Sequence, residues 1–143
     1  RFGIERVRAR LEKQAKAIDF FMKFTQLGVP TLIENPVGIM SVCFRKPDQI
    51  IQPYFFGDPY TKRTCLWLMG GLPKLQIDDD YIVEPKSSHK YKGSNPLGDF
   101  MYETSKLPYP QRGIARSKTF PGIARAIAEQ YKAFLTTNKE NRS

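Results

Sequence analysis

The sequence predicts an α/β fold, part of a doubly wound arrangement, in which a mainly parallel sheet carries an antiparallel hairpin at one edge. Three observations lead to this prediction. A helical pattern over residues 4–26 runs into a short apolar strand, which is half of a βαβ unit. Two strand-like runs flank the segment Gly57-Asp58-Pro59-Tyr60, as in a hairpin. An apolar stripe at helical spacing follows Pro121.

The length and charge of the chain narrow its class. Its 143 residues, 41% of them hydrophobic, suffice for a single domain with a real core. Seven basic and three acidic residues give residues 1–24 a charge of +4, and seven basic and two acidic give residues 111–143 a charge of +5. This excess is compatible with a polyanionic partner and equally with solvated helix faces. No apolar run reaches the roughly 18 residues of a membrane span, so a cytoplasmic protein is expected.

Residues 4–26 are expected to form the first helix. Its apolar positions recur near the helical period, with basic side chains on the other faces. These positions are Ile4, Val7, Leu11, Ile18, Phe21 and Met22. Gly28 and Pro30 end the helix. The apolar residues 29–33 then predict a short strand that ends in Glu34-Asn35-Pro36.

The second half of the chain predicts a hairpin, a loop-rich insertion and a final helix. Residues 50–56 and 64–68 read as paired strands, and Pro53 gives the first of them a bulge or an edge position. Residues 70–112 are expected to be loop-rich, with only Tyr81-Ile82-Val83 resembling a strand. A helix follows from Pro121 to residue 135, and residues 136–143 form a polar tail.

The order of these segments and the residues within them resemble a known protein family. The motifs IENPVG (33–38), IIQPYFFGDPYTKRTCLW (50–67) and SKTFPGIARAIAEQ (117–130) are similar to the C-terminal half of DNA cytosine-5 methyltransferases, especially the compact forms of phages and prophages. The resemblance covers roughly residues 4–135. It implies a Rossmann-like methyltransferase fold, DNA as substrate and S-adenosylmethionine as methyl donor.

The resemblance implies a catalytic role for Glu34 and Asn35. In the family, the glutamate at this place ends a sheet strand and contacts the flipped cytosine. When a cysteine thiolate attacks the ring, charge moves to the far ring nitrogen, and a carboxyl group hydrogen-bonded there stabilises the adduct. The alternative for Glu34 is a carboxylate that accepts backbone N–H groups where the strand turns.

Four cations are DNA-binding candidates by the same resemblance. The family turn reads Gly-x-Pro-Gln-x-Arg-x-Arg, and this chain has Tyr60 for the glutamine, Lys62 for the first arginine and Thr64 for the second. Lys62 and Arg63 would place positive charge near the DNA backbone, although a solvated turn explains them nearly as well. Arg45 and Lys46 are weaker candidates.

Thr119 and Phe120 are candidates for the methyl donor's pocket. They take the place of the family's Gly-Asn-(Ser/Ala)-Val-Pro segment without its asparagine. A helix cap and a core anchor are the alternatives for these two residues. In the family the target-recognition region lies between the two motifs, so residues 70–112 would be a reduced version of it.

Two family elements are absent from this sequence. It has neither the glycine-rich cofactor loop nor the Pro-Cys nucleophile, so this chain alone is not expected to complete the reaction. The resemblance therefore implies a further partner, either an N-terminal half of the same protein or a separate subunit. Two other interpretations stay open: a non-catalytic nucleic-acid-binding module, and a methylase that acts on another base or a nucleotide.

The remaining polar clusters predict no further chemistry. Cys43 and Cys65 sit among apolar residues and are expected to be buried, reduced thiols. Asp78-Asp79-Asp80 is interpreted as a solvated turn, and His89 lies in a polar stretch without partners for a triad or a zinc site. No metal is expected.

Overall fold

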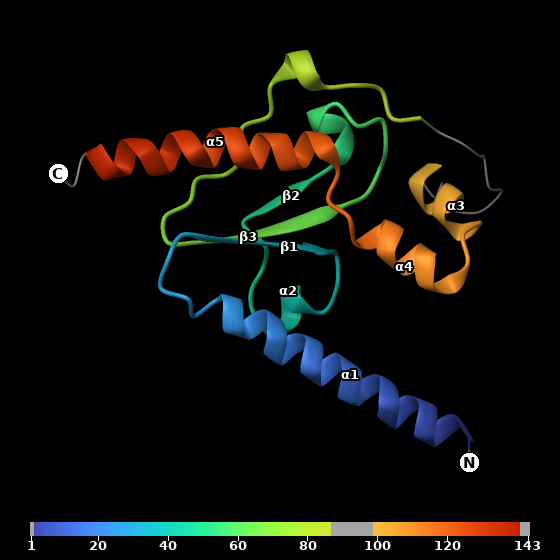
Figure 1. Ribbon diagram of the computed structural model, residues 1–143. Coiled ribbons are helices and arrows are strands. Elements are labelled where there is room, and N and C mark those ends of the chain that lie inside the picture. The colour runs from blue at the N-terminus through green and yellow to red at the C-terminus, as the bar shows by residue number, and fades with distance from the viewer. Residues whose placement is uncertain (1, 87–98, 141–143) are drawn as a thin grey trace. The chain divides into compact units, whose positions relative to one another are not determined.

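The computed structural model describes residues 2–86 and 99–140 (Figure 1). They form two compact units: unit 1 is residues 1–49 and 65–73, and unit 2 is residues 50–64 and 74–143. In chain order the elements are α1 (Phe2–Phe24), β1 (Thr31–Pro36), α2 (Met40–Cys43), β2 (Gln49–Ile51), the 3-10 helix η1 (Pro53–Phe56), β3 (Thr64–Met69), the 3-10 helix η2 (Asp79–Tyr81), α3 (Asp99–Ser105), α4 (Tyr109–Ser117) and α5 (Pro121–Glu140).

The three strands form one antiparallel sheet in the order β1-β3-β2. The predicted mainly parallel, Rossmann-like sheet is therefore wrong, because the described residues contain no parallel pair of neighbouring strands. Strands β1 and β2 each run antiparallel to β3 and so point the same way, but β3 lies between them. The apolar run 29–33 suggested a strand buried on both faces, whereas β1 is an edge strand that is only partly buried.

The two long helices are confirmed, with shifted ends. Helix α1 spans the predicted first helix, and α5 begins at Pro121 as expected but continues to Glu140, into the predicted polar tail. Strand β1 continues through Pro36, so Glu34 and Asn35 lie inside the strand rather than after it.

The hairpin is confirmed in outline, and the segment after it contains more helix than expected. Strands β2 and β3 are adjacent, but β2 has only three residues because Pro53 begins η1. Tyr81 ends η2, so residues 81–83 are not a strand. The described part of residues 70–112 also contains α3 and the beginning of α4, and His89 lies outside the described residues.

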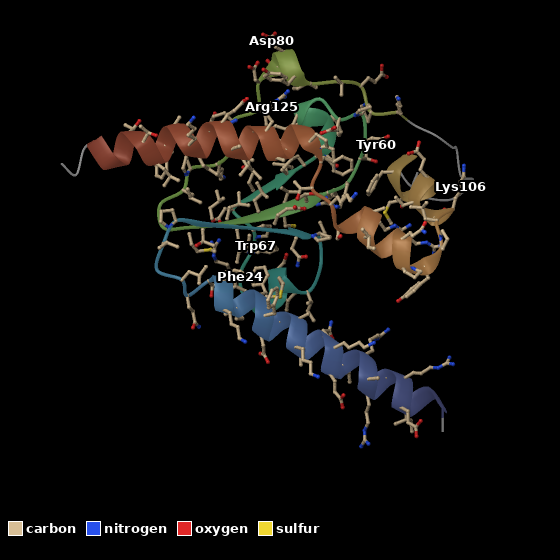
Figure 2. The ribbon with its side chains drawn as sticks, viewed as in Figure 1. Phe24, Tyr60, Trp67, Asp80, Lys106 and Arg125 are labelled. Atoms are coloured by element: carbon tan, nitrogen blue, oxygen red, sulfur yellow. The ribbon has the colours of Figure 1, made fainter. Side chains whose placement is uncertain are left out.

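Unit 1 packs α1 and α2 against β3. Phe21, Met40, Cys65 and Trp67 form its buried cluster, and Figure 2 shows Trp67 on the α1 side of the sheet. The Phe21 and Trp67 rings meet edge to face with centroids 5.2 Å apart. The indole N–H of Trp67 donates to the carbonyl oxygen of Arg45 at 2.9 Å, which satisfies the polar atom of a fully buried ring. Cys65 is buried as predicted, but Cys43 is exposed, so that half of the prediction is wrong.

A second set of contacts in unit 1 fastens the loop before β2 to β3. Arg45 and Asp48 form an ion pair at 2.7 Å. The backbone N–H of Leu68 donates to Asp48 Oδ2 at 2.7 Å, and Arg45 Nη2 donates to the Leu68 carbonyl oxygen at 3.1 Å. We call Arg45, Asp48 and Leu68 the loop clamp.

Unit 2 packs α5 against η1. The buried side chains of this core include Ile51, Phe56, Leu75, Phe120, Ile123 and Ala126. The first turn of α5 is fixed by Asp58, whose Oδ2 accepts from the backbone N–H of Gly122 at 2.7 Å. A Cβ at position 122 would collide with the Phe56 carbonyl oxygen, so only glycine fits this approach of helix to backbone. One turn later, the Arg125 guanidinium lies 4.1 Å from the centre of the Tyr81 ring.

Candidate functional site

The sequence-predicted catalytic pair lies in a cleft of unit 1. The cleft has a volume of about 470 Å³ and is lined by residues of α1 and β1 and by the start of α2. Glu34 and Asn35 contribute from β1, and three phenylalanines contribute from α1. Both polar residues are partly buried.

The spacing of phenylalanines along α1 builds the aromatic side of this cleft. Phe20 and Phe24 are four residues apart, so they share one face of the helix, and their rings meet edge to face at 4.9 Å. Phe21 points into the core and touches Trp67, which fixes the rotation of the helix. On β1, Ile33 packs on the same core.

The chemistry of this cleft suits a flat ring with polar edges. Glu34 and Asn35, at consecutive positions of β1, contribute a carboxyl group and an amide, which offer hydrogen-bond acceptors and donors. Aromatic faces beside them can cover the apolar surface of such a ring. We call Glu34, Asn35, Phe20, Phe21 and Phe24 the ring cleft.

Lys62 is engaged in internal contacts. Its Nζ donates to the carbonyl oxygen of Arg116 at 3.0 Å and lies 5.8 Å and 5.6 Å from the centres of the Phe100 and Phe120 rings. Its backbone N–H donates to Gln52 Oε1 at 2.8 Å. Lys62 thus ties the turn of unit 2 to α4, while the neighbouring Arg63 is exposed.

Arg45 and Lys46 differ in the same way. Arg45 belongs to the loop clamp and also lies 5.2 Å over the Phe44 ring, so its charge is compensated within unit 1. Lys46 is exposed. Of the four cations proposed for DNA contact, the structure therefore places Arg63 and Lys46 in solvent and gives Lys62 and Arg45 structural contacts.

Thr119 and Phe120 line a separate cavity in unit 2, of about 610 Å³. Phe120 is buried, and its ring lies 4.8 Å from that of Phe100 and 5.6 Å from that of Tyr60, centre to centre. Carboxyl groups of Asp58 and Glu103 also border this cavity. Phe120 therefore anchors the core and lines the cavity at the same time.

The structure brings some predicted residues together and adds others. Glu34 and Asn35 share the ring cleft, whereas Lys62, Thr119 and Phe120 belong to unit 2. The aromatic side of the ring cleft was not predicted as part of a site. The four-residue spacing of Phe20 and Phe24 was visible in the sequence, but the sequence did not show that both rings are exposed.

Neither a metal cluster nor a membrane-spanning helix accompanies the ring cleft in the part of the chain that the structure describes. Over residues 2–86 and 99–140, no three His, Cys, Asp or Glu side chains gather where they could hold a metal ion. No helix among those residues is both long and apolar enough to cross a lipid bilayer. No protein-family model, no curated protein and no solved structure matches this chain.

Proposed function

We propose that this chain is the cytosine-contacting part of a DNA cytosine-5 methyltransferase. The observation that carries the proposal is that Glu34 and Asn35, the pair singled out by the motif resemblance, line one cleft with three phenylalanine rings. A cytosine is a flat ring whose polar edge matches a carboxyl group and an amide. No other group of predicted residues in unit 1 has this composition.

In the proposed mechanism, the ring cleft binds a base that has left the duplex. Phe20 and Phe24 cover apolar ring surface, and Asn35 hydrogen-bonds to the polar edge of the base. Glu34 hydrogen-bonds to the ring nitrogen at which charge develops and supplies its proton. The thiolate that attacks the ring comes from the polypeptide that carries the Pro-Cys motif, which this sequence does not contain.

The residues that line the cavity of unit 2 support a site for the methyl donor there. S-adenosylmethionine, when bound, supplies the methyl group. The Tyr60, Phe100 and Phe120 rings offer faces for its adenine or its sulfonium, and the Asp58 and Glu103 carboxyl groups offer negative charge for its cationic groups. Thr119 borders the same space.

Replacing Glu34 by glutamine tests this proposal. In a protein that joins this chain to the part with the Pro-Cys nucleophile, Glu34→Gln removes the acid but keeps the shape of the side chain. We expect kcat for methyl transfer to cytosine to fall by about 10²–10⁴-fold, with an unchanged melting temperature. Glu129→Gln, an exposed carboxyl on α5, is the matched control and should leave kcat unchanged. Wild-type turnover in the Glu34→Gln protein would refute the assignment.

A second function, a non-catalytic nucleic-acid-binding module, is favoured by the charge on α1. Its six basic side chains, against three acidic ones, are exposed and make no ion pair that the structure records. They are Arg6, Arg8, Arg10, Lys13, Lys16 and Lys23. Such a face binds the DNA backbone without reading sequence.

The two functions differ in what they require. A module binds duplex DNA with an affinity that falls steeply with salt, and Glu34→Gln leaves that affinity unchanged. The methyltransferase transfers labelled methyl groups to DNA and depends on Glu34. Transfer to a free nucleotide but not to a duplex would select a methylase with another substrate. Each of these functions places the protein inside the cell, where DNA and the methyl donor are found.

A further inference from the structure

Helix α1 carries a regular apolar stripe that is longer than the core it serves. Six residues follow one another at alternating spacings of three and four, which is the heptad pattern of helices that pair side by side. They are Ile4, Val7, Leu11, Gln14, Ile18 and Phe21. All but Gln14 are apolar.

Only the C-terminal end of this stripe is covered. Phe21 is buried in unit 1, and Ile18 packs against the same cluster. In contrast, Ile4, Val7 and Leu11 are 69%, 51% and 54% exposed. Figure 1 shows this N-terminal half of α1, in dark blue, running out beyond β1 and α2 of unit 1. We call Ile4, Val7 and Leu11 the open stripe.

The open stripe is the kind of surface that helices bury against a partner. A helix gains most of its stability from packing an apolar face and little from its intrinsic propensity. The open stripe continues the packed part of the α1 stripe in the same register. A partner helix can therefore cover it without any change in the shape of α1. An exposed apolar face of this regularity indicates an interaction surface.

The residues beside the open stripe define the chemistry of its partner. In the heptad that starts at Ile4, the two positions flanking the contact are Arg8 and Arg10, both exposed. The acidic Glu5 and Glu12 lie at positions turned away from the contact. Both borders of the open stripe are thus cationic.

This charge pattern argues against a second copy of the chain as the occupant. In antiparallel self-pairing, Arg8 would face Arg8 and Arg10 would face Arg10, which is repulsive. In parallel self-pairing, Arg8 would face Gly3 and Arg10 would face Ala15, so neither would gain an opposite charge. A partner helix with an apolar stripe and with glutamates or aspartates on both of its borders would place an acidic side chain opposite Arg8 and another opposite Arg10.

We propose that the N-terminal half of α1 docks an amphipathic helix of another polypeptide segment, one whose apolar stripe is bordered on both sides by acidic residues. The apolar stripes supply the affinity, and the charges at Arg8 and Arg10 select the partner. This interaction is independent of the proposed methyltransferase function, because the ring cleft uses Phe20, Phe24 and the strand β1. It competes with the nucleic-acid-binding alternative, which also uses Arg8 and Arg10.

Two synthetic peptides test the proposal. Both have three heptads with leucine at the apolar positions, and they differ only in carrying glutamate or lysine at the bordering positions. Binding of each labelled peptide to the full 143-residue chain is measured by fluorescence anisotropy. We expect the glutamate peptide to bind at least about tenfold more tightly than the lysine peptide.

Variants of the chain distinguish binding at the open stripe from an effect of the overall charge of α1. Val7→Ser with Leu11→Ser should weaken the glutamate peptide at least about tenfold, and Arg8→Glu with Arg10→Glu should reverse the preference toward the lysine peptide. The matched control is Arg6→Glu with Lys13→Glu, which makes the same charge change on the helix face away from the contact. It should keep the preference for the glutamate peptide. Circular dichroism confirms that each variant retains its helix content.

Three outcomes would overturn the proposal. Equal binding of the two peptides, or equal effects of the two charge-reversed variants, would show that the borders do not select a partner. Sedimentation of the free chain as a dimer that Leu11→Ser dissociates would identify a second copy as the occupant. Binding of a DNA duplex of about 20 base pairs that depends on Val7 and Leu11 would identify nucleic acid instead.

Discussion

Asp48 makes the stability of unit 1 depend on pH. Burial raises the pKa of this carboxyl, but the hydrogen bond and charge of Arg45 and the N–H of Leu68 lower it by more, so the pKa lies below its ordinary value. A carboxyl with a lowered pKa in the folded state stabilises that state when it is ionised. This stabilisation is complete above the ordinary aspartate pKa of about 4. It is lost as the pH falls through the folded pKa.

Asp48→Asn should therefore reduce the loss of stability that the wild-type protein shows at acidic pH. We expect the wild-type free energy of unfolding to fall as the pH drops below about 4, and the variant to lose less over the same interval because it has no proton to take up. Urea unfolding followed by Trp67 fluorescence between neutral and acidic pH measures this. The same loss in both proteins would mean that other carboxyls govern the acid limb.

Unit 2 has no room for a side chain at position 122, which glycine occupies. Gly122→Ala places a methyl group against the Phe56 carbonyl oxygen and presses on the Asp58 hydrogen bond. We expect a loss of about 2–3 kcal/mol in the free energy of unfolding, the range of an overpacked interior. Gly113→Ala is the control, because a methyl group there meets nothing within 4 Å and lies in α4. It should be neutral or stabilising, by up to about 1 kcal/mol. Equal melting temperatures for the two variants would contradict this account.

The sequence could indicate Glu34 as a candidate but could not describe its surroundings. A charged residue after an apolar run marked the position, and the motif resemblance gave it a role. The ring cleft also needs the rotation of α1 about its axis, which depends on Phe21 entering the core beside Trp67. The internal role of Lys62 could not be predicted, because nothing local in the sequence reveals its bond to Arg116, 54 residues further along the chain.

Among the elements, α3 and α4 depend on each other through two arginines. Arg112 and Arg116 are four residues apart on α4, so both face the end of α3. Arg112 Nη2 donates to the carbonyl oxygen of Ser105 at 2.7 Å. Arg116 donates to the hydroxyl of Thr104 at 2.9 Å and to the carbonyl oxygen of Met101 at 3.1 Å. The carbonyl of Ser105 is among the last four of α3, which a helix leaves without an intrahelical partner, and Arg112 donates to it.

Arg116→Ala should therefore weaken α3 more than α4. The variant removes one hydrogen bond from the buried Thr104 hydroxyl and one from the Met101 carbonyl, so we expect unit 2 to lose about 2 kcal/mol. Amide hydrogen exchange should quicken at residues 100–105 and change little in α5. Lys132→Ala, an exposed cation on α5, is the control. Unchanged exchange in α3 would show that the arginine contacts do not support it.

Single elements were easier to predict than their pairing. Helices α1 and α5 have periodic apolar positions and proline or glycine at an end, and both were expected with their approximate bounds. Sheet order is a long-range property. Nothing in the apolar run 29–33 says that β3, rather than a parallel strand, lies beside it. Helix α3 was missed because its seven residues show no full apolar period.

At the scale of the whole molecule, each unit is assembled from two separate stretches of chain. Unit 1 needs residues 65–73 in addition to 1–49, and unit 2 needs 50–64 in addition to 74–143. The chain passes between the units within β2, within β3 and after Pro73. Contacts that are distant in sequence therefore hold each core together, and these form late and slowly.

Fragments of the chain should reveal this interleaving. A fragment of residues 74–143 lacks η1 and Asp58, against which α5 packs, so we expect low helix content and no cooperative thermal transition. A fragment of residues 50–143 contains all of unit 2 and should melt cooperatively. Circular dichroism on heating compares the two. Cooperative melting of the shorter fragment would mean that η1 is dispensable for the core.

The edge position of β1 affects how the protein must be handled. An edge strand presents backbone groups that can pair with another molecule, and natural edges are protected by charged residues and proline. Strand β1 has both, in Glu34 and Pro36, and no described strand pairs with its outer side. Glu34→Gln therefore removes the charge that protects this edge strand from aggregation, as well as the proposed catalytic acid. Its turnover should be compared with the wild type only in samples that light scattering shows to be equally monodisperse.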